Sequence, residues 1–381
     1  MTEKIKKFLA ENRLATPALV VDLDRVVDNY HRLAWHLPEA QIYYAIKANP
    51  APRILKSLAG EGAHFDAASI YEIREALACG AQPDRISFGN TIKKELDIAT
   101  AARLGISLYA FDSAVELEKL ARAAPGARVY CRLLMTNGSA GWPTSRKFGC
   151  DIVMARDLLI EARRLGLDPY GVSFHVGSQQ TDLNQWDIAI ARARLLFTSL
   201  QETGVELSMV NLGGGMPVAY GGDSEGPPIP TLQSGCQAIT AALLRHFGNQ
   251  PPRVIVEPGR ALVGDAGVIE SEVVLISRKS YSDERRWVYL DIGKFGGLAE
   301  TMDECIRYSI ETGHHVGVTG PVVLAGPTCD ETDVIYDRAR YELPLDLAVG
   351  DRVRILATGA YTSSYCSVGF NGFPPISEHY I

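Results

Sequence analysis

Short apolar runs alternate with amphipathic segments along most of the chain. The runs hold five to eight residues rich in Val, Ile, Ala and aromatic side chains, and they predict strands at 41–48, 64–68, 85–90, 107–112, 128–135, 171–178, 208–212 and 253–257. Between them apolar positions recur with helical spacing, at 52–59, 71–78, 93–103, 114–123, 155–165, 185–204 and 231–247. Alternation of this kind, with strands apolar on both faces, is typical of a parallel sheet covered by helices.

Eight strands in about 220 residues match the number and size of a (β/α)8 barrel. A doubly wound open sheet is the alternative, although it usually has fewer strands. After Arg260 the pattern changes to strands at 268–277, 286–291, 322–325, 334–338 and 351–357, with one short helix predicted at 300–308. We therefore predict an α/β protein with a TIM-like barrel at 24–262 and a mostly antiparallel β domain at 1–23 and 263–381, which the N-terminal strand joins.

Composition limits the classes of protein that need to be considered. The 381 residues are 46% hydrophobic and 22% charged, which is typical of globular domains with a large core. A net charge of −7 argues against nucleic acid as a partner. No apolar run is long enough to span a membrane, and we expect no signal peptide, because no apolar segment follows Met1–Lys7. Seven scattered cysteines without a CxxC pair favour free thiols in a reducing cytoplasm over disulfides or a metal site.

Two segments rich in Gly, Ser and Pro are predicted to be loops. They are Asn137–Thr144 and Gly221–Pro230.

Lys47 is the first candidate for chemistry, because it ends an apolar strand directly before Asn49-Pro50. A desolvated lysine has a lowered pKa, and its free amine can form a Schiff base with a carbonyl compound. The simpler interpretation is a lysine whose ammonium group reaches solvent from the end of a strand. The other strand ends favour the reactive interpretation, since polar residues collect at the rim where barrels build active sites: Asp66, Asn90, Asp112, Arg132, His175, Gly213–Gly215, Glu257 and Arg260.

Three of these strand ends indicate what the lysine would hold. Gly213-Gly214-Gly215 lets backbone N–H groups approach a phosphate, although a tight turn explains the glycines equally well. Glu257 needs a cationic partner, which either Arg260 or a protonated ring nitrogen would supply. His175 resembles a packed strand histidine, and the Gly-Ser pair that follows it forms a small anion-binding turn. Together with Lys47 these residues describe a pyridoxal 5'-phosphate (PLP) site.

Five segments, in this order, resemble the fold type III (alanine-racemase-fold) PLP-dependent basic amino acid decarboxylases: Tyr44–Asn49, His175–Ser178, Gly213–Gly215, Glu257–Arg260 and Gly326–Asp330. The resemblance covers nearly the whole chain, and within the family it is greatest to bacterial ornithine decarboxylases. Diaminopimelate decarboxylases share the lysine, histidine and EPGR elements. They usually carry Cys-Glu-Ser where this chain has Cys329-Asp330-Glu331, and they lack the Phe370–Phe373 ending.

The resemblance implies a role for each matching residue. Lys47 would carry PLP, His175 would stack on the pyridine ring and Glu257 would pair with the ring nitrogen. Asp66 and Arg132 would support the lysine and the cofactor. The phosphate-binding and other cofactor-binding residues would be Ser178, Gly213, Gly214, Gly215, Gly259, Arg260 and Tyr361.

For the substrate, the resemblance implies that Cys329 donates a proton to the carbanion carbon and that Asp330 binds the distal ammonium group. Both would act in the partner's site of a homodimer. Asp303-Glu304 stands where the family usually has a Tyr-Asp pair, and Phe295 stands where it has a tyrosine. The expected reaction is decarboxylation of L-ornithine to putrescine and CO2 in polyamine biosynthesis.

Several alternatives stay open from the sequence. One alternative is that lysine is the main substrate, or a second substrate beside ornithine. Another is that the substrate is diaminopimelate. A PLP-binding homeostasis protein without catalytic activity would need the barrel alone, and the β domain argues against it. An amino acid racemase would need a tyrosine base where this chain has Cys329.

Overall fold

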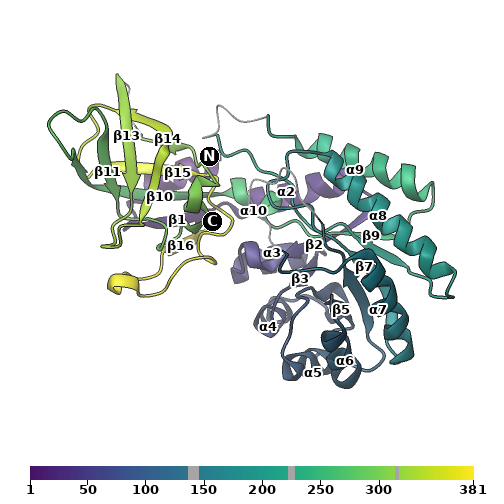
Figure 1. Ribbon diagram of the computed structural model, residues 1–381. Helices are drawn as coiled ribbons and strands as arrows, with labels where there is room; N and C mark the ends of the chain where they lie inside the picture. The colour runs from purple at the N-terminus through teal and green to yellow at the C-terminus, as the bar shows by residue number, and fades with distance from the viewer. Residues whose placement is uncertain (136–145, 222–227, 314–316) are drawn as a thin grey trace. The chain divides into compact units, whose positions relative to one another are not determined.

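The computed structural model describes residues 1–135, 146–221, 228–313 and 317–381 (Figure 1). The chain folds into two compact units. The first, here called the barrel unit, comprises Val27–Pro217 and Pro228–Gly259. The second, the sheet unit, comprises Met1–Val26, Val218–Pro227 and Arg260–Ile381. The loop predicted at 137–144 lies outside the described residues, as does 222–227 of the other predicted loop.

In its described residues the barrel unit closes eight parallel strands into a barrel, each paired with its neighbour in the chain and the last with the first. They are β2 (Ala40–Ala45), β3 (His64–Ala67), β4 (Ile86–Phe88), β5 (Leu108–Phe111), β6 (Arg128–Arg132), β7 (Asp168–Ser173), β8 (Met209–Asn211) and β9 (Arg253–Val256). Buried side chains from β2, β5, β6, β8 and β9 form one apolar cluster: Tyr43, Leu108, Ala110, Tyr130, Met209 and Ile255. The predicted barrel is confirmed, and the open sheet is excluded.

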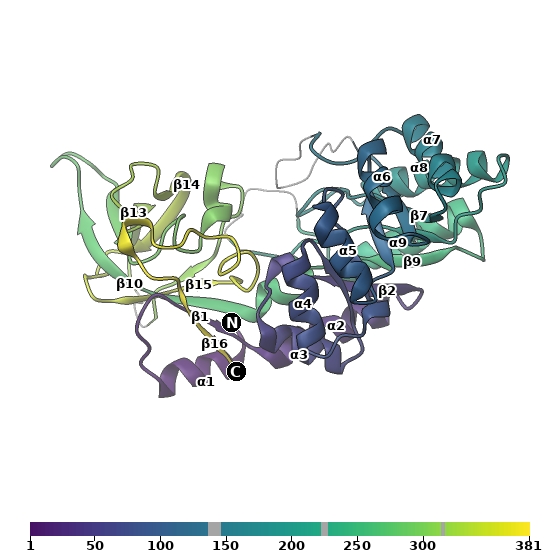
Figure 2. The ribbon, with the colours of Figure 1, turned by 90° about the horizontal axis from the view of Figure 1, so that it is seen from below.

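Helices surround the barrel strands (Figures 1 and 2). They are α2 (Leu23–His36), α3 (Pro52–Gly60), α4 (Ile70–Ala78), α5 (Glu95–Arg103), α6 (Ala114–Ala123), α7 (Ile152–Arg164), α8 (Asn184–Gln201) and α9 (Leu232–Phe247), with 3₁₀ turns η1 (Ile46–Ala48) and η2 (Pro83–Arg85). Side-chain caps start four of them, at Ser69, Ser113, Asp151 and Thr231. None of the helices in the described ranges has the length and apolar character that a bilayer span requires.

The sheet unit is built on an eight-stranded sheet in its described part. Its elements are α1 (Glu3–Glu11), β1 (Ala18–Val21), α10 (Arg260–Val263), η3 (Gly264–Ala266), β10 (Gly267–Ser277), β11 (Arg286–Leu290), η4 (Ala299–Glu304), β12 (Ile310–Glu311), β13 (Thr319–Ala325), β14 (Val334–Pro344), β15 (Arg352–Leu356), η5 (Phe370–Gly372) and β16 (Ser377–Tyr380). β1 pairs antiparallel with β10 and parallel with β16, so the N-terminal strand does join this sheet. Most of the other pairings are antiparallel, and β11–β13 is parallel.

Two expectations for this unit are wrong in detail. The helix expected at 300–308 is the shorter 3₁₀ turn η4, because Asp303 and Glu304 adopt left-handed φ values of 54° and 57°. The strands β12 and β16 were not predicted, since they hold two and four residues and mix polar with apolar side chains.

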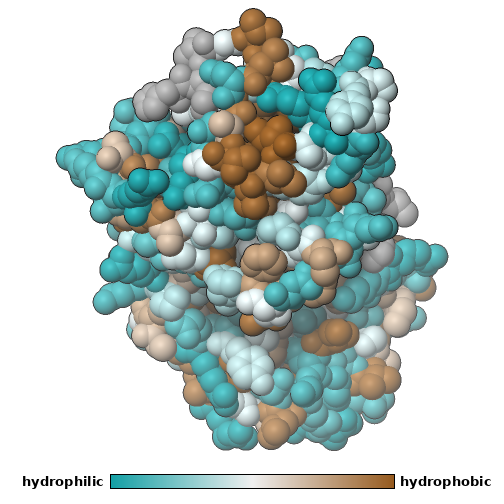
Figure 3. Space-filling model, turned by 90° about the vertical axis from the view of Figure 1, so that its left-hand side faces the viewer, coloured by the Kyte–Doolittle hydropathy of each residue, from teal (hydrophilic) through white to brown (hydrophobic). Residues whose placement is uncertain are grey.

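The surface of the sheet unit carries apolar side chains gathered in one area (Figure 3). The exposed large apolar residues of this unit include Val318 at 75%, Val349 at 61% and Leu345 at 54%. Val318 and Leu345 are neighbours, since the N–H of Leu345 donates to the carbonyl of Val318 at 2.9 Å.

Candidate active site

Lys47 lies in a single 3₁₀ turn just beyond the C-terminal end of a barrel strand. β2 ends at Ala45 and η1 follows at once, so the lysine is outside the strand. The hydroxyl of Tyr44 donates to the carbonyl of Asn49 at 2.8 Å and holds this turn. The side chain of Lys47 is exposed, although the residues on either side of it are buried. The expectation of a buried lysine is therefore wrong, because the turn takes Lys47 out of the apolar strand.

Gly259 packs against this lysine turn. An added Cβ on Gly259 would lie 2.8 Å from the Cβ of Ala48 and 3.3 Å from that of Ala45. The N–H of Ala45 also donates to the carbonyl of Pro258 at 3.0 Å. The segment after β9 is thus held against the end of β2, and glycine is required for the close approach.

The positive charge of Lys47 acts to lower the pKa of two carboxylates, Asp66 and Glu257. Asp66 is 5% exposed and accepts a hydrogen bond from Oγ of Ser87 at 3.3 Å. Burial raises its pKa, and the positive charge of Lys47 opposes that shift. Burial also raises the pKa of Glu257 to about 7, the charge of Asp66 adds to the effect, and Lys47 again opposes it. Two negative carboxylates in one buried site repel each other. A cation bound beside them would reduce that repulsion and would itself be stabilised.

Asn211, at the end of β8, connects Glu257 to the glycine loop. Its Nδ2 donates to Oε1 of Glu257 at 2.5 Å, and its Oδ1 accepts from the N–H of Gly213 at 2.9 Å. The N–H of Glu257 donates in turn to the carbonyl of Gly213 at 2.8 Å. Sequence analysis did not single out Asn211, because a polar residue before a Gly-rich turn is an ordinary turn signal.

The glycine loop has a bare backbone that closely approaches the turn after β7. An added Cβ on Gly213 would lie 2.4 Å from the carbonyl oxygen of Phe174, and one on Gly215 would lie 2.5 Å from that of Gly177. Both glycines also have left-handed φ values, 65° and 99°. The loop thus lies beside the turn that contains Ser178. A concave backbone surface without side chains is suited to a phosphate group.

His175 follows β7 and is held in one orientation. Its Nδ1 accepts a hydrogen bond from the N–H of Gly177 at 2.9 Å. Burial lowers its pKa to about 3, and the positive charges of Arg132 and Lys47 contribute. The imidazole is therefore neutral at neutral pH, so its flat face can lie against a cationic ring without charge repulsion.

Other predicted rim residues hold the loops around the barrel. The guanidinium of Arg132, the last residue of β6, lies 5.1 Å from the ring centre of Phe148. Asp112 accepts the N–H of Gly149 at 2.7 Å, and Asn90 donates to a carbonyl after β3 at 3.2 Å. Arg132 also acts on the site through its charge, which lowers the pKa of the nearby carboxylates.

Glu72 is a third carboxylate near Lys47, and the sequence analysis did not identify it. It accepts the N–H of Ala68 at 2.6 Å, and burial raises its pKa to about 7. The charge of Lys47 opposes that shift. Its backbone N–H donates to the capping side chain of Ser69 at 3.2 Å. Ser-x-x-Glu at a helix start is a capping-box pattern, so the sequence signal pointed to helix initiation and not to the site.

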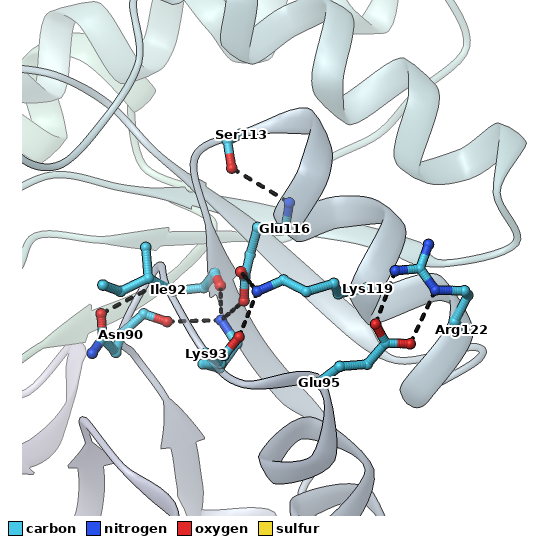
Figure 4. Close-up of polar contacts among 9 residues, drawn as sticks. Asn90, Ile92, Lys93, Glu95, Ser113, Glu116, Lys119 and Arg122 are labelled. Carbon is cyan, nitrogen blue, oxygen red and sulfur yellow. Dashed lines mark hydrogen bonds and ion pairs between the residues drawn. The ribbon is translucent and has the colours of Figure 1, made fainter.

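A buried group of ion pairs supports the rim between β4 and α6 (Figure 4). Nζ of Lys93 donates to the carbonyls of Asn90 and Ala110, each at 2.7 Å, and lies 3.0 Å from Glu116. Lys119 pairs with the same carboxylate at 2.5 Å. Burial lowers the pKa of Lys93 to about 8. Removing one member of such a pair costs about 3–5 kcal/mol, so the cluster fixes the loop after β4.

Arg260 belongs to the sheet unit and is bound by neighbours there. Its guanidinium donates to both carboxylate oxygens of Glu300, at 2.6 and 2.5 Å, and to the hydroxyl of Tyr220 at 2.5 Å. It also lies 4.8 Å from the ring centre of Tyr361, whose φ is 58°. Sequence analysis missed Glu300, which stood in a predicted helix. The phosphate-binding role of Arg260 and Tyr361 stays a prediction.

Cys329 and Asp330 lie in the loop between β13 and β14. Cys329 is exposed and Asp330 is half-buried. Oδ1 of Asp330 accepts from the N–H and the hydroxyl of Thr332, at 2.8 and 2.6 Å. These bonds lower the pKa of Asp330, so its carboxylate is ionised at neutral pH and can accept further hydrogen bonds from a cation.

Asp303 and Glu304 differ in what their side chains do. The carboxylate of Glu304 accepts three backbone N–H groups of β14, from Asp337 and Arg338 at 2.8 Å and from Ala339 at 2.7 Å. Asp303 is exposed. Glu304 is therefore used to hold η4 against the sheet, and Asp303 is the more accessible carboxylate of the two.

The barrel rim fits pyridoxal phosphate on three observations. Lys47 is an exposed residue at the end of a barrel strand, the glycine loop offers a backbone cradle that side chains would fill, and Glu257 is a carboxylate that a protonated ring nitrogen would stabilise. Within the residues that the structure describes, His, Cys, Asp and Glu side chains form no group of three or more placed to hold a metal ion.

Comparison with known proteins agrees with this chemistry. Residues 23–264 match the family model for the pyridoxal-binding domain of pyridoxal-dependent decarboxylases. The lysine/ornithine decarboxylase of Selenomonas ruminantium is 35% identical over 373 residues, which cover 98% of this chain and 91% of that protein. The ornithine decarboxylase of Schizosaccharomyces pombe is 33% identical over 363 residues, covering 90% and 78%. The solved S. ruminantium lysine decarboxylase with PLP and cadaverine has a TM-score of 0.88 at 34% identity, covering 100% and 94%.

These matches extend across both units. The predictions of an amino acid decarboxylase and of its cofactor, PLP, are confirmed. The chain belongs to the fold type III PLP-dependent decarboxylases of basic amino acids.

Proposed function

We propose that this enzyme decarboxylates L-ornithine to putrescine and CO2. The observation that carries the proposal is an exposed lysine, Lys47, whose charge acts on three buried or half-buried carboxylates, Asp66, Glu72 and Glu257. PLP, when bound, supplies an electron-accepting pyridine ring that takes up the electron pair left by the departing CO2. The remaining work falls to side chains of the protein.

In the barrel unit, Lys47 would hold PLP covalently and return to it after each turnover. Glu257 would keep the ring nitrogen protonated, supported by the hydrogen bond from Asn211. The neutral imidazole of His175 would lie on the ring face, and its bond from Gly177 keeps it from rotating away. The glycine loop and Ser178 would hold the phosphate, with Gly259, Arg260 and Tyr361 as further candidates. Asp66 and Arg132 would set the charge around the amine.

Side chains of the sheet unit would act on the substrate. Cys329 would hold a proton at Sγ and deliver it to the substrate carbon that has lost CO2. Asp330 would accept the distal ammonium group through a charge-assisted hydrogen bond. Asp303 is a better second acceptor than Glu304, because the Glu304 carboxylate already accepts three N–H groups. We propose that Cys329 and Asp330 serve the site of a partner subunit in a homodimer.

L-Lysine is the second candidate substrate, and the likeness to a lysine/ornithine decarboxylase favours it. Its side chain is one methylene longer, a difference worth about 1–3 kcal/mol of discrimination. Diaminopimelate ends in a group that bears a carboxylate, which the negative charges of Asp330 and Asp303 would repel. A PLP-binding protein without catalytic activity would have no use for an exposed thiol beside an ionised aspartate.

The test is CO2 release from ornithine, lysine, arginine and diaminopimelate, each measured with the wild type and with Lys47→Ala. Ornithine is expected to give the largest kcat/KM, and Lys47→Ala is expected to lose both turnover and the PLP absorbance band near the visible edge. Faster turnover of lysine would reverse the order of the two substrates. Turnover retained by Lys47→Ala would overturn the assignment of the lysine.

A further inference from the structure

A buried aspartate, Asp333, forms hydrogen bonds that hold the loop containing Cys329 and Asp330. Asp333 is 2% exposed, and its carboxylate accepts the hydroxyl of Thr328 at 2.7 Å and the N–H of Thr328 at 3.2 Å. Its main chain closes the loop, since its N–H donates to the carbonyl of Asp330 at 3.0 Å. These contacts fix Thr328, the residue before Cys329, and Asp330 itself.

The same carboxylate binds a second segment, the turn after β11. Oδ1 of Asp333 accepts the N–H of Lys294 at 2.8 Å. The backbone of two glycines lies against this carboxylate. A Cβ added to Gly293 would lie 2.1 Å from a carboxylate oxygen of Asp333, and a Cβ added to Gly326 would lie 2.4 Å from one. Two glycines therefore allow one carboxylate to join two loops.

A third segment, the one around Asn371, binds Cys329 itself. Oδ1 of Asn371 accepts the N–H of Cys329 at 3.0 Å across 42 residues of sequence. Asn371 has a left-handed φ of 51°, a conformation that asparagine tolerates better than most residues. This segment is tied in turn to the second, the turn after β11: the N–H of Ser367 donates to the carbonyl of Phe295 at 3.0 Å, and the rings of Phe295 and Phe370 lie 4.7 Å apart.

All three segments border a cavity of about 200 Å³, which Gly293, Phe295, Pro327, Thr328, Phe370 and Phe373 help to line. Hydrogen bonds to Asp333 and Asn371 therefore hold the backbone of the Cys329 loop beside this space. The exposed thiol lies at the top of a loop whose backbone is fixed at three points.

We infer that Asp333 and Asn371 are positioning residues that set the place from which the Cys329 thiol reaches the substrate. The inference rests on the proposed role of Cys329 as proton donor. Proton delivery needs the thiol within hydrogen-bond reach of one carbon, and a misplacement of about 1 Å can cost about 100-fold in rate. Neither residue touches the substrate in this account, since both act through the backbone of the loop.

A matched pair of variants at Asn371 tests the inference. Asn371→Gly keeps the left-handed backbone but removes the acceptor, whereas Asn371→Asp keeps an acceptor at the same distance and also tolerates this conformation. The PLP-loaded enzymes are compared by hydrogen–deuterium exchange of the peptide that contains Cys329 and by kcat for ornithine. The absorbance of bound PLP checks that both variants hold the cofactor.

The expected result for Asn371→Gly is exchange about tenfold faster at the Cys329 amide, through loss of its hydrogen bond. We expect kcat to fall about 100-fold with KM nearly unchanged. Asn371→Asp is expected to restore slow exchange and most of the rate. Asp333→Asn, which removes one acceptor oxygen from the same loop, is expected to lower kcat in the same way.

Unchanged exchange in Asn371→Gly, or faster exchange with wild-type kcat, would overturn the inference while leaving the proposed function intact. Wild-type turnover in Cys329→Ala would instead overturn the proposed role of the thiol. The exchange data would in that case still report on the hydrogen bond, so the two failures are distinguishable.

Discussion

Asn211 donates a hydrogen bond from Nδ2 to Oε1 of Glu257 over 2.5 Å, while its Oδ1 accepts the N–H of Gly213 at 2.9 Å. One amide thus serves both the carboxylate proposed to face the pyridine nitrogen and the loop proposed to hold the phosphate. Burial raises the pKa of Glu257 to about 7, and the bond from Asn211 works against that shift. The charge state of Glu257 at neutral pH therefore depends on this donor.

Replacing Asn211 with Asp separates the two functions of the amide. The substitution keeps an acceptor for the N–H of Gly213 but replaces the donor to Glu257 with a like charge. The pKa of Glu257 should then rise above about 7, so less of it is ionised at neutral pH. We expect the acid limb of the kcat–pH profile to move up by about one unit or more. An acid limb at the wild-type position would show that Glu257 does not control it.

The raised pKa of Glu257 also predicts a pH-dependent stability in the absence of PLP. The folded protein holds this proton up to about pH 7, whereas an unfolded chain releases it near the ordinary value of 4.5. Between these pH values the folded state binds more protons than the unfolded chain. The stabilisation contributed by protonated Glu257 is therefore present at low pH and is lost as the pH rises through this window.

Glu257→Gln removes that titration. The free energy of unfolding of the PLP-free variant, measured in urea, is expected to exceed that of the wild type by more at pH 8 than at pH 5. Glu206→Gln, a change of the same kind at an exposed position, serves as the control and should give equal differences at both pH values. A difference for Glu257→Gln that does not vary with pH would contradict the raised pKa.

The repeating pattern of apolar runs was enough to predict the barrel, because each strand is buried on both faces and is followed by an amphipathic helix. It also placed Asp66, His175 and Glu257 at one rim, since parallel strands end at the same side of a barrel. Supporting residues could not be predicted in this way. Asn211 and Glu72 have local patterns that are typical of a turn and of a helix cap, and their contacts with the site depend on the closed fold.

The β domain was harder to predict in detail. Strand β16 pairs in parallel with β1 across the length of the chain, and no local pattern indicates such a pairing. The left-handed residues Asp303 and Asn371 are likewise set by tertiary contacts, so the expected helix at 300–308 was not found. Lys47 was expected to be desolvated because its neighbours are apolar, but a 3₁₀ turn after β2 exposes it.

Mixing two inactive variants tests the proposed shared site. Lys47→Ala and Cys329→Ala each lack one residue of every site in their own homodimers. In a mixed dimer, one site combines the intact Lys47 of one subunit with the intact Cys329 of its partner. Random exchange of subunits would therefore return about a quarter of wild-type activity, because half the dimers are mixed and each has one good site. Activity that stays at the level of the separate variants would show that each chain completes its own site.

Asp303 and Glu304 are expected to respond differently to loss of charge. Asp303→Asn keeps a residue that tolerates the left-handed backbone and should change stability by no more than about 0.5 kcal/mol. It should raise the KM for ornithine about tenfold, since a charge-assisted bond to the distal ammonium is lost.

Glu304→Gln replaces one oxygen that accepts backbone N–H groups of β14 by a donor. Because these N–H groups lose a charged acceptor, and hydrogen bonds to charged groups contribute about 1.5–3 kcal/mol, it should lower the free energy of unfolding by about that amount with little effect on KM. Urea unfolding and initial-rate kinetics on both variants check the pair, and the reverse pattern would assign the substrate contact to Glu304.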